Sequence, residues 1–542
     1  MAKMIDVSKG TARRLVDIHG WSAAVLGLAL YIVVFSGAIV VFSHEIGNWS
    51  VSGHKQGEGI AGNIDAKLIS LAEQVDEDYL EEVTLFQNSA GELITFFHTH
   101  VNNDEGELEE KGTRFVLDPD SLEILSRDDG FREDMPIISS GFLERFYIDL
   151  HVRLHAPGVI GLYLTGILGL ILFVSAVSGF ILHRHLIKDV FLSPRLSTRL
   201  MNTRDRHALA GTWGLVFSIL LAFTGAFFSF ATTLGLPVIA ITAFAGDQHL
   251  ALETIIGIPE AEDDTPKNFV GLEAIITNSQ QEDVAGSTPI FIAVQHWGRA
   301  DSRVITTHGP TAEGSMFFTN HRYDGVTGEY LGEKPGLGNV PSTGSTVIGL
   351  IGVLHFGWFA GLLSRIIWLS LGLAMCYVTL TGLQLWVQRR EKSDTWQSLS
   401  RFISVIGYGL PFSMVTAAVG FLFSYSSSEY DVENWTVTGF LLGVVLSFIV
   451  GFVYPVAEQR EKLFQKITGL GFISLPIIRL LTSEQSWAEY SHAIAVMSMD
   501  ISLFITGLIL LVLSTGIMRA KRFNVKASVE TSATEPAFEA KA

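Results

Sequence analysis

The sequence has one cysteine, Cys376, in 542 residues. A single cysteine cannot form an internal disulfide, and it cannot supply the thiolates of a Cys-based zinc or iron–sulfur site. Charged residues are also scarce, at 17% against 48% apolar residues, which argues against a water-soluble globule with an ordinary surface. The net charge of -18 argues against nucleic acid as a partner, because phosphate binding requires clustered Lys and Arg.

Nucleotide-binding motifs are missing as well. No glycine-rich fingerprint opens a helix after a strand, and no Gly-Lys pair of a P-loop occurs. The sequence therefore predicts neither a nicotinamide or flavin domain of the Rossmann type nor an ATPase. An electron-transfer protein of the membrane without such a domain takes its electrons from membrane quinol or from a separate cytoplasmic donor.

Long apolar runs are the dominant feature of the chain. Eight of them reach or approach the roughly 20 residues that a helix needs to cross a bilayer core. They cover approximately 21–43, 158–182, 209–232, 362–388, 402–424, 436–455, 467–482 and 493–518. Lys and Arg gather before the first run and after the second, fourth, sixth and eighth, which places both termini in the cytoplasm. The predicted fold is a polytopic α-helical membrane protein with about eight transmembrane helices and the lipid bilayer as its surroundings.

Two long segments between these runs are expected outside the membrane. The helical stretches within them are 65–79 and 268–278, and the strand-like runs are 82–88, 93–100, 113–118, 289–295, 303–307 and 315–320. Each segment predicts a small α+β domain, in which a helix covers an antiparallel sheet. Each also shows a turn before a last strand, at Leu117-Asp118-Pro119 in the first and Tyr323-Asp324-Gly325 in the second.

These features divide the chain into seven parts. They are an N-terminal segment with the first span (1–43), a first outer domain (44–157), the second and third spans with their cytoplasmic loop (158–232), a second outer domain (233–344), an interfacial helix with the fourth span (345–392), a C-terminal four-helix membrane region (393–522) and a disordered cytoplasmic tail (523–542).

The first and third apolar helices resemble each other. His19 opens the first and Ser36-Gly37 lies near its far end, while His207 opens the third and Thr224-Gly225 lies near its far end. The spacing from histidine to glycine is eighteen residues in both.

A similar match links the second and fourth helices. His151 precedes Ser178-Gly179 and His355 precedes Thr381-Gly382, at spacings of twenty-eight and twenty-seven residues. The unit of helix, outer domain and helix is thus used twice in the same orientation, as an internal parallel repeat.

The repeat has a chemical consequence. A pseudo-two-fold axis along the membrane normal can bring His19 to face His207 near the cytoplasmic side, and His151 to face His355 near the outer side. Two facing imidazoles are what a six-coordinate haem iron requires, so the pattern predicts two stacked haems. An amphipathic role at the membrane surface remains open for each histidine. His155, one helical turn after His151, can replace it as a ligand or serve the substrate.

Other polar residues stand out. Arg365 is expected at the membrane interface, where it can pair with a haem propionate, and Asp500 lies within the eighth run, where proton or quinol chemistry and a structural hydrogen bond are both open. Five histidines of the outer domains are expected to be exposed on strands: His98, His100, His296, His308 and His321.

Two stretches carry a family resemblance. Ile18-His19-Gly20-Trp21, and above all Leu354-His355-Phe356-Gly357 continuing through Arg365 to Thr381-Gly382-Leu383, resemble the PepSY-associated transmembrane family over roughly residues 10–392. The resemblance implies a protein of the bacterial inner membrane with two PepSY-like periplasmic domains and haem b, which carries electrons outward to reduce ferric iron held by a chelator such as a siderophore. It implies haem-binding roles for His19, His151, His207 and His355.

The leading hypothesis is therefore a di-haem b oxidoreductase, a ferric-chelate reductase of the periplasmic face with two low-spin bis-histidine haems. Two alternatives remain open: a membrane transporter that moves iron or a siderophore without redox chemistry, and a regulatory membrane protein whose PepSY-like domains bind a partner. The last four helices lie outside the resemblance.

Overall fold

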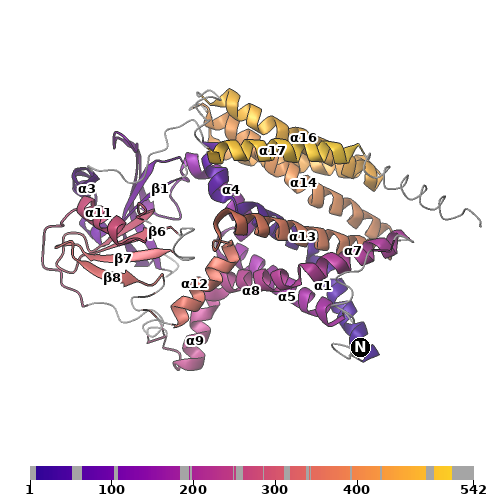
Figure 1. Cartoon of the computed structure of the whole chain (residues 1–542), viewed down its shortest axis with the longest axis horizontal. Coiled ribbons are helices and arrows are strands. Elements are labelled where there is room, and N and C mark those ends of the chain that lie inside the picture. The colour runs from indigo at the N-terminus through magenta and orange to yellow at the C-terminus, as the bar shows by residue number, and fades with distance from the viewer. Residues whose placement is uncertain are drawn as a thin grey trace, which may run out of the picture. The chain divides into compact units, whose positions relative to one another are not determined.

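The computed structural model describes most of the chain, and its described residues form two compact units, Met1–Gly382 and Leu383–Ala542 (Figure 1). The described residues are 8–51, 64–88, 90–102, 108–182, 194–195, 198–247, 250–251, 261–284, 286–309, 318–336, 338, 341, 343–390, 393–427, 430–483 and 494–515.

Long apolar helices form the membrane part of the first unit. They are α1 (Lys9–Val40), α5 (Gly158–Leu182), α7 (Arg199–Trp213), α8 (Leu215–Phe230) and most of α13 (Gly361–Gln388). Three of them are each long and apolar enough to cross a membrane, and α7 with α8 counts as one more span, bent by 65°. With the four helices of the second unit, the described residues contain seven spans, or eight with the bent pair, which confirms the predicted polytopic fold.

Two shorter helices precede two of these spans. α4 (Phe142–Val152) ends just before α5, and α12 (Thr343–Phe356) ends just before α13. The connections turn sharply through backbone with positive φ, at Leu154 and His155 in the first and at Gly357 and Gly361 in the second. The chain thus repeats a helix, a bend and a long helix, with His151 and His355 at the ends of the two short helices. Short helices α2 (Ser43–Ser50) and α9 (Leu236–Ala243) follow α1 and α8.

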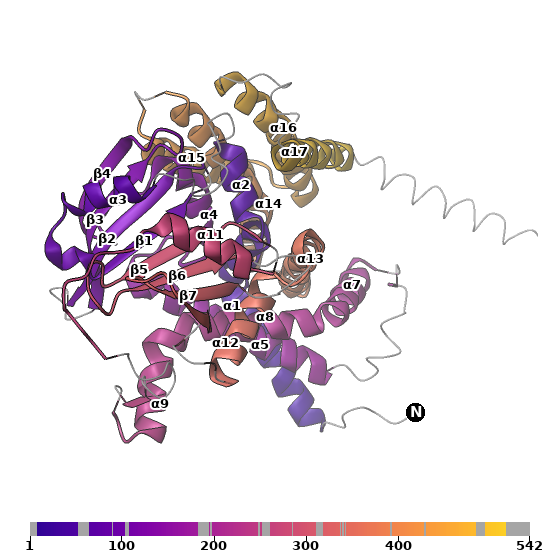
Figure 2. The ribbon, with the colours of Figure 1, turned by 60° about the vertical axis from the view of Figure 1, so that its left-hand side comes forward.

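Outside the membrane helices, the described residues build one antiparallel sheet of eight strands (Figure 2). Its strands are β1 (Glu82–Gln87), β2 (Leu93–Asn102), β3 (Leu108–Leu117), β4 (Ile124–Phe131), β5 (Phe291–Gln295), β6 (Arg303–His308), β7 (Thr319–Asp324) and β8 (Tyr330–Lys334). The order β4-β3-β2-β1-β5-β6-β7-β8 joins the two halves through β1 and β5. The two predicted sheets are therefore halves of one sheet, and each half covers what would be an exposed edge of the other.

One face of this sheet carries the hydrophobic core. α3 (Ile64–Ala72) and α11 (Leu272–Glu282) pack on it with residues such as Leu68 and Ile275, which are fully buried together with Phe97 and Tyr323 of the strands. Asp65 of α3 caps α11 by accepting a hydrogen bond of 2.6 Å from the Leu272 amide. We call the eight strands with α3 and α11 the sheet domain.

The two halves of the sheet domain repeat even the details of a turn. Asp118 accepts hydrogen bonds from the amides of Asp120 and Ser121, and Asp324 accepts them from the amides of Val326 and Thr327. The strand pairing then shifts register at the same place in both halves, beside Leu117 and beside Tyr323. The predicted turns and last strands are confirmed.

Several predicted boundaries differ from the structure. The run 113–118 covers only the end of β3 (Leu108–Leu117), and the helical stretch 268–278 begins four residues before α11 (Leu272–Glu282). Residues 315–317 of the run 315–320 lie outside the described residues, and β7 begins at Thr319. The helical stretch 65–79 is broken into α3 and a 3-10 turn, Glu77–Leu80. The ends of helices and strands are the features that sequence patterns define least well.

The second unit is a set of four helices, α14 (Asp394–Tyr425), α15 (Val432–Val453), α16 (Ala457–Thr482) and α17 (Ile494–Ser514). Glycines let their backbones approach closely. A Cβ at Gly439 would lie 2.4 Å from the carbonyl oxygen of Thr416, and one at Gly507 would lie 2.6 Å from that of Gly469. This is the small-residue packing that is typical of helices in lipid.

Candidate functional site

The structure brings the four repeat-related histidines together as two pairs. His19 of α1 faces His207 of α7, with 6.1 Å between ring centres and 71° between ring planes. His151 of α4 faces His355 of α12, with 6.3 Å between ring centres and 25° between planes. We call these the first pair and the second pair. The residues of each pair come from different halves of the repeat, as the pseudo-two-fold axis predicts.

The first pair is held by hydrogen bonds to the helix that follows in each half. His19 Nδ1 lies 3.0 Å from the carbonyl oxygen of Ser175 and 3.2 Å from Ser178 Oγ on α5. His207 Nδ1 lies 3.0 Å from the carbonyl oxygen of Val378 and 3.2 Å from Thr381 Oγ1 on α13. The two anchoring arrangements are the same.

The second pair is anchored on the helix that precedes it in each half. His151 Nδ1 lies 2.9 Å from the carbonyl oxygen of Val33 on α1, and His355 Nδ1 lies 2.9 Å from Thr224 Oγ1 on α8. The Thr224 hydroxyl donates its own proton to the carbonyl oxygen of Leu220 at 2.8 Å, so it accepts the bond from His355.

These contacts indicate which nitrogen of each imidazole ring carries the proton. A carbonyl oxygen only accepts hydrogen bonds, so each anchored Nδ1 carries the proton and Nε2 carries the lone pair. Histidines that ligate metals through Nε2 have this second bond, which fixes the tautomer and the ring orientation. All four imidazole rings are half-buried.

A glycine lies against each imidazole. A Cβ at Gly37 would lie 2.6 Å from His151 Cε1, one at Gly382 3.1 Å from His207 Cε1, one at Gly179 3.3 Å from His19 Cε1 and one at Gly225 3.5 Å from His355 Cε1. Sequence reasoning used these Ser-Gly and Thr-Gly pairs only as markers of the repeat and missed their role as seats for the rings. The signal was present, since the same dipeptide pattern occurs at four equivalent positions.

The spacing within each pair fits coordination to one iron. An imidazole nitrogen lies about 2.0 Å from a bound first-row metal and about 1.1 Å from its own ring centre, so two rings on opposite sides of one iron have centres about 6.2 Å apart. The observed 6.1 and 6.3 Å match this value. Rotation of either ring about the nitrogen–metal–nitrogen axis leaves the distance unchanged, so the different interplanar angles are both compatible with it.

The two pairs lie at different depths along α1. This helix carries His19 itself and, fourteen residues later, the Val33 carbonyl that holds His151. At 1.5 Å per residue, the two levels are separated by about 21 Å, which is most of the thickness of a bilayer core.

His155 and Arg365 take other positions. The His155 ring lies 4.3 Å from that of Phe146, and it is His151 that faces His355. Arg365 forms an ion pair with Glu45 of α2 and lies over the ring of Phe42 at 5.4 Å, so its observed charge partner is a carboxylate of the chain.

Asp500 lies in an ion pair within the second unit. Its carboxylate is 2.5 Å from the Arg479 guanidinium, and the two side chains are 4% and 2% exposed. An ion pair in the helix bundle favours the structural interpretation of Asp500 over proton or quinol chemistry.

The expectation that the sheet-domain histidines are exposed is wrong for three of them. His98, His308 and His321 are 2%, 0% and 1% exposed, because their strand positions point into packed layers. His100 is exposed, as expected.

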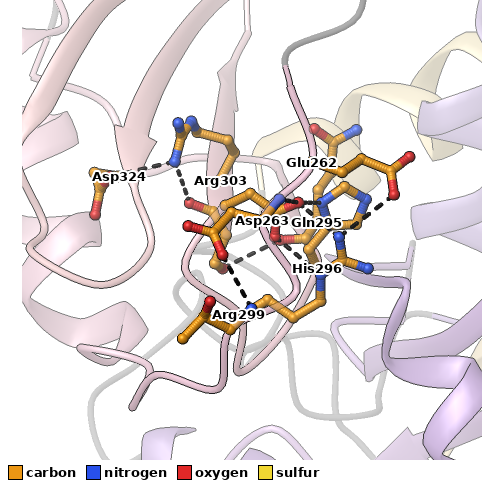
Figure 3. Close-up of polar contacts among 10 residues, drawn as sticks. Glu262, Asp263, Gln295, His296, Arg299, Arg303 and Asp324 are labelled. Atoms are coloured by element: carbon orange, nitrogen blue, oxygen red, sulfur yellow. Dashed lines mark hydrogen bonds and ion pairs between the residues drawn. The ribbon is translucent and has the colours of Figure 1, made fainter.

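His296 belongs to a polar cluster at the turn between β5 and β6 (Figure 3). Its Nδ1 lies 3.0 Å from Asp301 Oδ2, and Arg299 binds the same carboxylate at 2.7 Å. His296 has a φ of 54°, so these contacts hold a turn that a residue with a side chain rarely adopts. We assign His296 to the stability of this turn.

Comparisons with known proteins match the part of the chain that holds both pairs. The family model described as PepSY-associated TM region matches residues 16–389, which include all four paired histidines. The curated protein named uncharacterized protein PA4219, from Pseudomonas aeruginosa, is 24% identical over 363 residues, or 61% of this chain and 86% of that protein.

Proposed function

Since the chain belongs to the PepSY-associated transmembrane family, we propose that it is a di-haem b electron-transfer protein that reduces ferric chelates, such as a ferric siderophore, at the periplasmic face of the bacterial inner membrane. The observation that supports this most is the facing of two Nδ1-anchored imidazole pairs at the ring spacing of bis-histidine coordination.

In this proposal each pair holds one haem b. A bound haem supplies one-electron transfer between Fe(III) and Fe(II). His19 with His207 would hold one haem iron, and His151 with His355 would hold the other. The hydrogen bond of each Nδ1 fixes the tautomer and the orientation of the ring, which favours a single low-spin ligation. The four glycines leave room beside the rings.

The proposed orientation of the two pairs rests on the distribution of positive charge. Arg13 and Arg14 precede His19, and Arg204 and Arg206 precede His207, so the positive-inside rule places the first pair toward the cytoplasm. Electrons would enter there from quinol or from a cytoplasmic donor. The second pair lies on α4 and α12, the helices that follow the two halves of the sheet domain, and would deliver the electron outside.

The reaction transfers one electron to chelated Fe(III) and yields Fe(II). Because Fe(II) has a lower charge, hard oxygen ligands hold it less strongly, and the iron is released. A non-redox transporter or a partner-binding regulator has no need for two imidazole pairs with this spacing and anchoring.

The test is the visible spectrum of the detergent-purified protein before and after dithionite, with haem counted per chain. We expect two haems in the wild type and about one in each of His19→Ala, His151→Ala, His207→Ala and His355→Ala, because an iron that loses an axial ligand is held weakly. His44→Ala is the matched control, since His44 is an exposed helix-end histidine whose side chain contacts Asn48.

His155→Ala tests the alternative ligand and should keep both haems. Protein that is colourless despite ample haem supply would refute the di-haem proposal. Reoxidation of the reduced protein by a ferric chelate under anaerobic conditions, with Fe(II) trapped by ferrozine, then tests the substrate. A wild type that is not reoxidised would refute the reductase activity even if both haems are present.

A further inference from the structure

A second set of metal-ligand side chains lies in the sheet domain, away from the histidine pairs. Glu82 on β1 is directly opposite His98 on β2, and His100 is two residues further along β2. Residues two apart on a strand point to the same face, so all three side chains share one face of the sheet. One ligand atom from each lies within 4.8 Å of the other two.

Both imidazoles are oriented by oxygen atoms behind them. His98 Nδ1 lies 3.3 Å from the Phe96 carbonyl oxygen, and its ring stacks on that of Phe96 at 4.5 Å. His100 Nδ1 lies 3.6 Å from Glu81 Oε1. A proton on Nδ1 satisfies both contacts and leaves the Nε2 lone pair for a ligand, which is the arrangement behind most metal-bound histidines.

The third member is a carboxylate in an unfavourable place for a negative charge. Burial raises the pKa of Glu82; His100 acts in the opposite direction, and the nearby Glu110 and Glu81 raise the pKa again. His98 is almost fully buried, and burial lowers its pKa, so it is held in the neutral form that binds metals. A cation at this place would relieve the repulsion among the carboxylates.

We propose that Glu82, His98 and His100 bind a divalent first-row transition-metal ion. Two imidazoles and one carboxylate form a set that suits Fe(II), Zn(II) and related ions, and three protein ligands leave coordination positions for water or a chelator. If the proposed reduction of ferric chelates holds, Fe(II) is the ion available to the site in the cell, and only this choice of ion rests on the proposed function.

The second half of the sheet domain lacks this set. Strand register makes Leu85 equivalent to Ile292, because each lies opposite the matching threonine, Thr95 or Thr306. Counting from there, Pro289 stands where Glu82 would be, and Gly309 stands where His98 would be. The fold therefore forms without these side chains, and their presence in one half only favours a role beyond folding.

The experiment measures Zn(II) bound to the full-length, detergent-purified protein by equilibrium dialysis and elemental analysis. Zinc is the probe because it is redox-inactive and distinct from haem iron. We expect one ion per chain in the wild type, and an affinity lower by about tenfold or more in each of Glu82→Gln, His98→Gln and His100→Gln. Glu109→Gln is the matched control, because Glu109 is a carboxylate of the adjacent strand β3 that points to the opposite face.

Two further measurements make the result decisive. The His355→Ala variant should bind zinc like the wild type, so loss of haem and loss of this site are separable. Anaerobic Fe(II) should compete for the bound zinc, more weakly, in the order expected for divalent ions. Absence of bound zinc in the wild type, or equal affinity in Glu82→Gln, His100→Gln and Glu109→Gln, would overturn the proposal.

Discussion

The two halves of the sheet domain place different side chains at the same position in the core. In the first half, Phe97 and Phe115 meet edge to face, with ring centres 6.0 Å apart and planes at 88°. At the equivalent positions of the second half, His308 and His321 meet at 5.2 Å and 74°. The equivalence follows from strand pairing, since Phe115 and His321 each lie opposite the corresponding threonine and two residues before the shift in register.

This difference shows that the repeat preserves backbone geometry and not core chemistry. The Nε2 atoms of His308 and His321 are buried, and in the described structure they have no hydrogen-bond partner. An unsatisfied polar atom in a core is unfavourable, and an apolar ring avoids that penalty. The second half should therefore be the less stable half of one continuous sheet.

The membrane halves differ in a similar way around the second pair. A Cβ at Gly37 would lie 2.6 Å from the His151 ring, closer than real Cβ contacts, whereas one at the equivalent Gly225 would lie 3.5 Å from the His355 ring, an ordinary contact. Within the second pair, His151 therefore packs more closely against its glycine than His355 does.

The largest effect is expected from adding a methyl group at the glycine that lies closer to its imidazole ring. Gly37→Ala should displace the His151 ring from the Val33 carbonyl and from His355, and under the proposed function it should remove one of the two haems. Gly225→Ala is the matched control and should keep both. Haem content and the dithionite-reduced spectrum measure the result, and Gly382→Ala and Gly179→Ala should fall between the two, in that order. Equal haem content in the Gly37 and Gly225 variants would contradict the interpretation of these glycines as seats for the rings.

The pairing of the histidines followed from the sequence because it depends on few quantities. Apolar runs place the helices, and the equal spacings from His19 to Gly37 and from His207 to Gly225 identify the repeat. Once two copies run in the same direction, symmetry alone brings equivalent ends together.

The sheet could not be predicted to the same depth. The pairing of β1 with β5 joins strands that are about two hundred residues apart in the sequence. Local sequence patterns do not indicate which strand edges pair over such a separation. The burial of His98 and His308 depends on strand phase, and a slip of one residue in reading a strand moves every side chain to the other face.

A smaller effect is expected from making the two halves alike. His308→Phe with His321→Phe copies the ring pair of the first half and removes two unsatisfied buried nitrogens, each unfavourable by roughly 1–3 kcal/mol. It also removes the hydrogen bonds of His308 Nδ1 with Ser287 Oγ and of His321 Nδ1 with Tyr330 Oη, each worth about 0.5–1.5 kcal/mol, so we expect a small net stabilisation of the second half. Hydrogen exchange of the full-length protein should then slow in β6 and β7 and stay unchanged in β2 and β3. The reverse double variant, Phe97→His with Phe115→His, should speed exchange in β2 and β3. Faster exchange of β6 and β7 in the first variant would show that the Nδ1 hydrogen bonds outweigh the penalty of the two unsatisfied Nε2 atoms.

The smallest effect is a dependence on pH that arises from the buried histidine pair of the second half. Burial lowers the pKa of His308 below the ordinary value of 6.5, and His321 beside it lowers it further, while Asp283 at 3.9 Å acts in the opposite direction. Between the two pKa values the unfolded state binds more protons than the folded state, so stability falls as the pH drops below about 6.5, by up to about 1.4 kcal/mol per proton and pH unit. Exchange of β6 and β7, corrected for the intrinsic rate, should therefore become faster from pH 7 to pH 5. The difference should vanish in the double phenylalanine variant, and its persistence there would assign the dependence to another group.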